Sequence, residues 1–300
     1  MTDPSRAEPT LPKSTLELDP EKAKELEEKF DSEIRFRPLA PAAGWIVGGL
    51  LVVLSLFHYY TAGFGLLSEM VHRGIHLSFV LGLVFLVFPF SKRGYDQPAQ
   101  GSLLRPLGIS LLDWALAIGA VVSVLHVPLI PLDDLAFRVG NPTTTDVVLG
   151  GILIFVLLEA TRRSVGWPLP VIALIFMGYA IWGPSMPGIL IHPGASFPQL
   201  VDHLYLTTQG IYGIALGVVA TYVFHFVLFG VFATRIGLGQ LFLDCAAWVA
   251  GRFAGGPAKV SIFGSALFGM ISGSSVANTV TVGSLTIPAP ASRSLSIIYP

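Results

Sequence analysis

The chain has 300 residues, 53% of them hydrophobic and only 12% charged, with a formal net charge of -1. Soluble domains carry about 25% charged residues, so the composition excludes an ordinary soluble protein and predicts an all-α integral membrane protein. No Lys/Arg-rich tract with interleaved aromatic residues occurs, which argues against a nucleic-acid partner. The one cysteine, Cys245, cannot form an internal disulfide, and no cysteine or histidine spacing indicates a metal or other cofactor.

Residues 1–40 form a polar leader, which holds seven of the 18 Lys/Arg and ten of the 19 Asp/Glu residues of the chain. Asp19 is a suitable N-cap and Pro20 a suitable first helical residue. We therefore expect a short surface helix within a cytosolic leader.

Six apolar runs come close to the roughly 20 residues that a helix needs to cross a membrane. They cover residues 44–60, 75–90, 111–130, 147–160, 167–183 and 210–234. The fourth run is short, so we expect its helix either to tilt little or to begin earlier, within 141–146. The next apolar stretch is interrupted by glycine, so residues 240–253 are predicted to form an interfacial helix.

The loop charges orient this array, because cytoplasmic loops carry the excess of Lys and Arg. With the N-terminus inside, only Arg73 and Arg138 fall outside. The inner loops hold eight basic residues: Lys92, Arg93, Arg105, Arg162, Arg163, Arg235, Arg252 and Lys259. We expect a multi-pass inner-membrane protein with a cytoplasmic N-terminus. The outer connection 184–209 either packs on neighbouring helices or forms a docking platform.

Ionisable residues within or beside predicted spans are candidates for function, and they include Asp113, Glu159 and His225. Asp113 is interpreted as lying at the cytoplasmic interface. Glu159 stands next to Arg162 and Arg163, which can neutralise it. His225 lies deeper and either relays protons or hydrogen-bonds across helices; both alternatives stay open.

Residues 261–288 are apolar but rich in glycine and hydroxyl side chains. The segment SGSS, residues 272–275, interrupts the helical pattern at its middle, which favours a re-entrant helical hairpin. Unwound backbone at membrane depth is tolerated only where it is buried in protein or lines a hydrated cavity. Its carbonyl and hydroxyl oxygens suit Na⁺, as in the broken helices of secondary transporters. The alternative is close helix packing by small residues.

The run GSALFGMISGSSVANTVTVGSLTIP, residues 264–288, resembles the first re-entrant hairpin in the large membrane subunit of tripartite ATP-independent periplasmic (TRAP) transporters. Residues 72–90 and 162–184 are similar to the fused form of these permeases, of the TAXI type, in which the small and large subunits share one polypeptide. The resemblance implies the first part of an inverted-repeat secondary transporter. The resemblance also implies that it would take up small organic acids, driven by Na⁺, by an elevator mechanism.

The resemblance also implies partners and site residues. A periplasmic substrate-binding protein would deliver a small carboxylate substrate. Residues 41–165 would be the four-helix small-subunit-like region, and 166–288 the start of the large-subunit-like transport region. Sodium would be bound by Ser272, Gly273, Ser274 and Asn278, and the substrate would lie near Ser275, Thr279 and Thr281.

Residues 289–300 depart from the family pattern and look like a truncation, since a second hairpin would be expected to follow. A second polypeptide would then have to complete the transport domain. The main alternative function is a membrane scaffold or assembly subunit without transport. An intramembrane serine protease is not expected, because the last histidine, His225, precedes every serine of the motif, and we predict no enzyme. Proton coupling in place of Na⁺ stays open.

Overall fold

The computed structural model describes residues 36–65, 67–90, 106–250, 256–271, 278–279 and 282, and every regular element in these ranges is helical. The predicted leader helix and the atypical tail 289–300 lie outside the described residues. The described residues fall into two compact units, which meet between Phe226 and Val227. The predicted boundary between residues 165 and 166 stays a prediction.

Five helical segments are long and apolar enough to cross a membrane. They are α2 (Pro41–Phe64), α3 (Glu69–Val87), α4 (Leu111–Leu129), α6 (Thr144–Ser164) and the segment Ile214–Ala233, which consists of α9 (Ile214–Val218), the π-helix η6 (Val219–Val223) and most of α10 (Phe224–Arg235). The predicted multi-pass helical architecture is confirmed at this level. The early start expected for the fourth span is also observed, because a capping box at Thr143 begins α6 there.

A sixth span is not confirmed. The run predicted at 167–183 forms α7 (Pro168–Ile181), which has 14 residues and is therefore only about 21 Å long at 1.5 Å per residue. Pro168 occupies its first turn, and Gly183 and Pro184 follow its end in a 3₁₀ turn, η3 (Gly183–Ser185). Hydropathy reflects the apolar residues of this run. It does not show that the helix begins at Pro168 and ends before Gly183 and Pro184.

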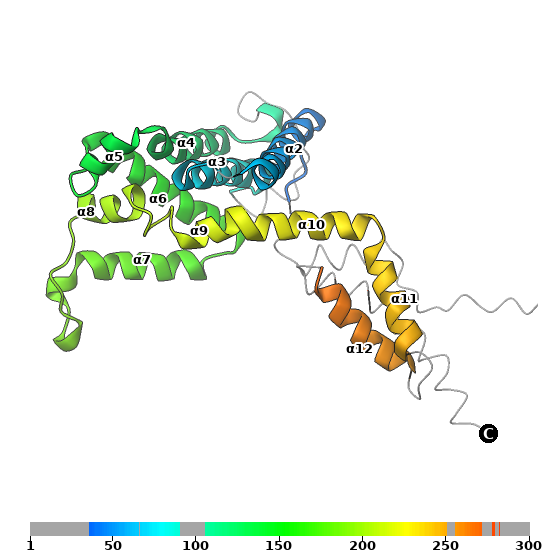
Figure 1. Ribbon diagram of the computed structural model, residues 1–300. Helices are drawn as coiled ribbons and strands as arrows, with labels where there is room; N and C mark the ends of the chain where they lie inside the picture. The colour runs from blue at the N-terminus through cyan, green and yellow to red at the C-terminus, as the bar shows by residue number, and fades with distance from the viewer. Residues whose placement is uncertain are drawn as a thin grey trace, which may run out of the picture. The chain divides into compact units, whose positions relative to one another are not determined.

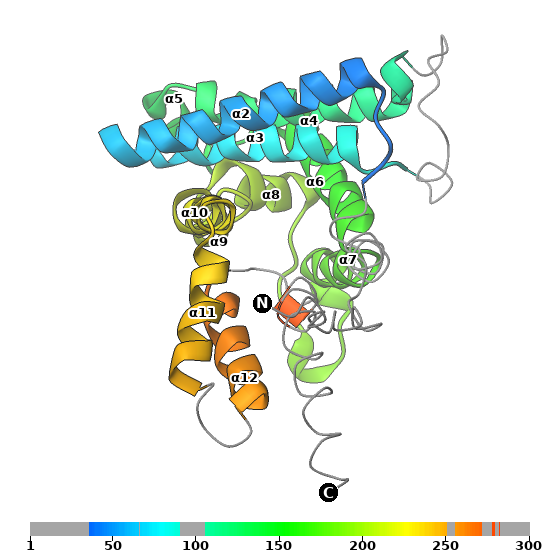
Figure 2. The same cartoon turned by 90° about the vertical axis from the view of Figure 1, so that its right-hand side faces the viewer.

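Helix α3 is central to the first unit and packs on α2, α4 and α6. Both views show α2, α3 and α4 lying along one another (Figure 1, Figure 2). Phe85, Ala120, Val124 and Leu153 are completely buried between them. Large apolar side chains also remain exposed on the outer faces, such as Trp45 of α2, as expected where lipid replaces water as the solvent.

Short elements link the long helices. They are η2 (Pro106–Gly108), α5 (Leu132–Arg138), η4 (Gly188–Leu190), α8 (Phe197–Val201) and the π-helix η5 (Asp202–Leu206). The later part of the predicted outer connection packs on the core, where Tyr205 donates a hydrogen bond to the Ser123 carbonyl at 2.5 Å. Tyr212 does the same to the Val124 carbonyl at 2.6 Å. Burial raises the pKa of both phenols, so both remain donors.

The second unit holds the end of α10, α11 (Leu238–Ala250) and α12 (Gly256–Gly269). Helices α11 and α12 lie side by side in both views (Figure 1, Figure 2). Leu243, Phe268 and Val282 form a small buried cluster between them. The predicted interfacial helix 240–253 corresponds to α11 in the structure.

Candidate functional site

The chain reverses direction after α12. The side-chain amide of Asn278 donates to the Ser265 carbonyl at 3.2 Å, and the Ser265 hydroxyl donates to Asn278 Oδ1 at 3.4 Å. A continuous helix would separate two residues 13 positions apart by roughly 20 Å. The two residues therefore belong to antiparallel arms. That this reversal is a re-entrant hairpin spanning 261–288 stays a prediction.

Helix α10 approaches the end of α12 closely at a glycine. A β-carbon on Gly230 would lie 2.5 Å from the carbonyl oxygen of Ile271, a distance that side chains essentially never reach. Gly269 is similar, since its β-carbon would lie 3.2 Å from the Asn278 amide nitrogen. A β-carbon on Gly269 would therefore crowd the Asn278 side chain, which is half-buried.

We expect Gly230→Ala to lower the free energy of unfolding by about 1–3 kcal/mol, because the added methyl group overpacks against backbone. Gly63→Ala is the matched control: Gly63 also lies within a helix, and a β-carbon there would meet nothing within 4 Å. Thermal unfolding in detergent measures both. Equal stability of the two variants would contradict the close approach of α10 to Ile271.

Only part of the predicted ion and substrate site can be placed. Asn278 and Thr279 are described, and Asn278 is half-buried whereas Thr279 is exposed. The other predicted site residues lie outside the described residues: Ser272, Gly273, Ser274, Ser275 and Thr281. Sequence reasoning missed Ser265, because its segment GSALFG has the pattern of a packing motif and its partner is 13 positions away.

The oxygens gathered at this point are of one chemical kind. They comprise the carbonyl and hydroxyl of Ser265 and the amide oxygen of Asn278. Such hard, neutral oxygens are the ligands that alkali cations prefer in broken-helix sites. We therefore take the contact between Ser265 and Asn278 as the candidate functional site.

An arginine clamp, defined as Arg37, Asp113, Glu159, Arg162 and Arg163, lies at one end of the four-helix core. Asp113 is 2.9 Å from Arg37 Nη2 and 2.6 Å from Arg163 Nη1, and all three side chains are nearly fully buried. Arg163 Nε also donates to Glu159 at 2.8 Å, and Arg162 Nε does so at 2.7 Å. Both carboxylates are thus neutralised by the arginines, as was expected for Glu159.

Asp146 organises the opposite end of the core and is completely buried. It accepts hydrogen bonds from the Thr143 backbone and hydroxyl at 2.9 and 2.6 Å, from His126 at 2.9 Å and from Arg138 at 3.2 Å. The capping pattern of residues 143–146 predicts the two hydrogen bonds from Thr143 to Asp146. No local sequence pattern predicts the hydrogen bonds that His126 of α4 and Arg138 of α5 donate to Asp146.

His225 hydrogen-bonds across helices: its Nε2 donates to the His58 carbonyl at 2.9 Å. Three further histidines surround the same point, namely His58, His72 and His76, and we call the four residues the histidine cluster. The ring centroids of His72, His76 and His225 each lie 5.0–5.4 Å from that of His58. Sequence reasoning identified only His225, because the other three lie near helix ends, where histidine is unremarkable.

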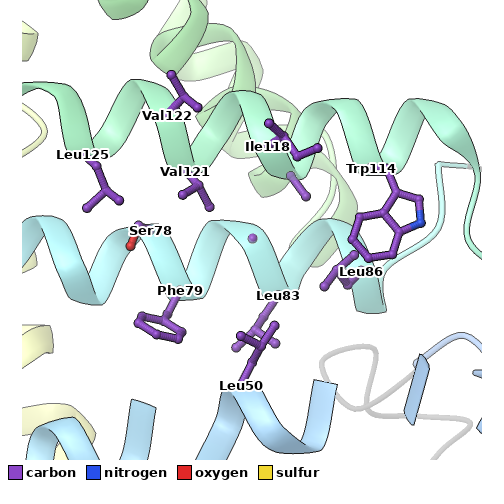
Figure 3. Close-up of a pocket in the computed structure, with 12 residues that line it drawn as sticks. Leu50, Ser78, Phe79, Leu83, Leu86, Trp114, Ile118, Val121, Val122 and Leu125 are labelled. Atoms are coloured by element: carbon purple, nitrogen blue, oxygen red, sulfur yellow. The ribbon is translucent and has the colours of Figure 1, made fainter. Parts of the chain in front are cut away.

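The pocket between α2, α3 and α4 has a volume of about 410 Å³. Figure 3 shows Leu50, Phe79, Leu83 and Trp114 around it. The one hydroxyl in its described lining, that of Ser78, already donates to the Ile75 carbonyl at 2.8 Å. Without a charged group in that lining, this pocket suits an apolar occupant and not a carboxylate substrate.

The model of a protein family described as "Tripartite ATP-independent periplasmic transporter, DctM component" matches residues 152–295. The matched segment begins within α6 and includes α7, α10, α11, α12 and the contact between Ser265 and Asn278. No curated protein and no solved structure matches the chain.

Proposed function

Because residues 152–295 belong to the DctM component of tripartite ATP-independent periplasmic transporters, we propose that this chain is a permease component of a Na⁺-driven transporter that takes up small organic acids. Proteins of this family are transporters, not enzymes, and act with a periplasmic binding protein and a small membrane subunit. The five apolar helices of membrane length agree with a multi-pass inner-membrane protein.

In this proposal the four long helices preceding α7 supply the small-subunit function within the same polypeptide. The arginine clamp supports this arrangement, because Asp113 of α4 pairs with Arg37, which precedes α2, and with Arg163 of α6. These contacts join the three helices. The excess of basic residues at the predicted inner side supports a cytoplasmic N-terminus. A periplasmic binding protein would then meet the opposite end, near Asp146.

The proposed Na⁺ ligands come from Ser272, Gly273, Ser274 and Asn278, to which we add the carbonyl oxygen of Ser265. Ser275, Thr279 and Thr281 are proposed to face the carboxylate substrate. The single observation that carries this proposal is the contact between Asn278 and Ser265, which gathers neutral oxygens at a chain reversal inside the family segment. An elevator-type movement of the transport region follows from the family resemblance.

Sodium binding to the full chain tests the proposed site. We expect Asn278→Ala to weaken binding of radioactive Na⁺ in lipid nanodiscs by at least about tenfold, which corresponds to about 1.4 kcal/mol, because an amide oxygen is lost. Ser265→Ala should have a smaller effect, since it keeps the backbone carbonyl. Excess K⁺ should not displace the bound Na⁺.

Asn141→Ala is the matched control, because Asn141 is exposed in the turn before α6. It should bind Na⁺ like the unmodified chain, and thermal unfolding should show that each variant is folded. If the unmodified chain binds no Na⁺, the scaffold alternative gains support. If Asn278→Ala binds Na⁺ normally, the ion site lies elsewhere in the chain.

A further inference from the structure

The histidine cluster gathers four of the seven histidines of the chain at the junction of α2, α3 and the start of α10. The exposed fractions of His58, His72 and His76 are 0%, 2% and 3%. Phe224 stacks on the group, with its ring centroid 4.2 Å from that of His58. Four titratable rings inside an apolar junction exceed what helix packing requires.

The hydrogen bonds determine which ring nitrogens carry hydrogen. A backbone carbonyl only accepts, so Nε2 of His225, 2.9 Å from the His58 carbonyl, must be a donor. The same holds for Nε2 of His72, 3.3 Å from the Ala220 carbonyl, which the π-helical turn η6 presents. In the neutral rings, Nδ1 of both residues is therefore a bare acceptor.

His58 and His76 share one hydrogen, since His58 Nε2 lies 2.9 Å from His76 Nδ1. Nδ1 of His58 is buried without a hydrogen-bond partner, as are Nδ1 of His72 and of His225. If His58 donates from Nε2, its Nδ1 is a third buried acceptor. Leaving such a group unsatisfied costs about 1–3 kcal/mol, so the cluster holds basic nitrogens that lack a donor.

A cavity with both apolar and polar lining lies beside this group. Its volume is about 230 Å³, and His72 forms part of its wall together with Glu69, Arg73, Thr221 and Tyr222. The share of liquid volume of one water is about 30 Å³, so several water molecules fit. The cavity lies at the start of α3, where His72 occupies the first turn and His76 the second.

We propose that the histidine cluster is a proton-binding site, in which Nδ1 of His58 takes a proton and the hydrogen bond between His58 and His76 lets these two rings share it, with His72 and His225 packed beside them. The ligand is a proton and not a metal ion, since the described residues contain no His/Cys/Asp/Glu group arranged to hold one. This site is independent of the proposed Na⁺ site and goes beyond the proposed function.

The charged neighbours of the cluster are Glu69 and Arg73. Arg73 pairs with Glu69 at 3.1 Å and donates to the Tyr212 carbonyl at 2.8 Å, so its charge is partly compensated. Tyr222 and the four histidines are the other titratable groups at the site or its cavity. A proton bound here converts an acceptor nitrogen into a donor and so changes which contacts join α3 to η6.

Side-chain nitrogen NMR of the full chain in nanodiscs, with labelled histidine, tests this proposal between about pH 4 and pH 8, the range in which histidine changes charge in proteins. We expect the four cluster rings to respond to a common step, because one bound proton affects all the rings packed on His58, and the apparent pKa of strongly interacting groups belongs to the group and not to one residue. His58→Gln should break the common step into separate ones. His203→Gln, at an exposed histidine of η5, should leave it unchanged.

Glu69→Gln provides a second variant, since the Glu69 side chain is 74% exposed and its replacement should not disturb folding. Removing this negative charge should weaken proton binding by about twofold to threefold, and added salt should reduce the difference. Cluster signals that stay constant while His203 titrates would overturn the proposal. Four independent titrations that His58→Gln leaves unaltered would do so as well.

Discussion

Replacing Asp113 with alanine is expected to lower the free energy of unfolding by about 3–5 kcal/mol, the usual cost of removing one partner from a buried ion pair. Arg37 and Arg163 both contact this carboxylate, and Arg163 has no exposed side-chain surface. The variant therefore leaves positive charge buried without its main counterion. Reversible unfolding in mixed detergent micelles measures the change.

Asp133→Ala is the matched control, because Asp133 is exposed on α5 and its loss should change stability by less than about 0.5 kcal/mol. Asp113→Asn should resemble Asp113→Ala, since an amide restores size but not charge. If Asp113→Ala unfolds like Asp133→Ala, the clamp does not hold the four-helix core together.

The second large effect is expected at the other end of the core. Asp146→Ala should cost about 3 kcal/mol, as the sum of an N-cap of about 1 kcal/mol and two hydrogen bonds to partly charged donors, each about 1 kcal/mol. The donors are His126 and Arg138, whose side chains remain 23% and 30% exposed. That exposure keeps the expected loss below the one at Asp113.

Thr143→Ala separates the two contributions, since it removes the cap to α6 but keeps the contacts of Asp146 with α4 and α5. It should cost only about 1 kcal/mol. Thermal unfolding of both variants in the same detergent makes the comparison. A loss at Asp146→Ala no greater than at Thr143→Ala would show that His126 and Arg138 contribute nothing to stability.

The long helices could be predicted because membrane solvation depends on composition alone. Apolar runs located five segments of spanning length, and the residues TTTD before the fourth run indicated its true start at Thr144. Helix length was predicted less well where proline or glycine ends a helix. Proline and glycine limit α7 to 14 residues, although its side chains are as apolar as those of a span.

The polar contacts were largely beyond sequence reasoning, because hydropathy does not show which helix faces which. Arg37 was grouped with the solvated leader, yet it is 6% exposed and donates to the Phe85 and Phe88 carbonyls. His58, His72 and His76 looked like isolated residues until α2 and α3 were placed together. Asn278 was identified by its chemistry, but its partner Ser265 was not.

The arginine clamp also constrains the order in which the protein is assembled. Arg163 and Asp113 lie 50 positions apart, and Arg37 and Phe85 lie 48 apart, whereas Ser265 and Asn278 are only 13 apart. Chain synthesis proceeds from the N-terminus, so Asp113 is made before Arg163 exists. The ion pair between them can form only after α6 has been made, whereas the contact between Ser265 and Asn278 needs only a short further stretch of chain.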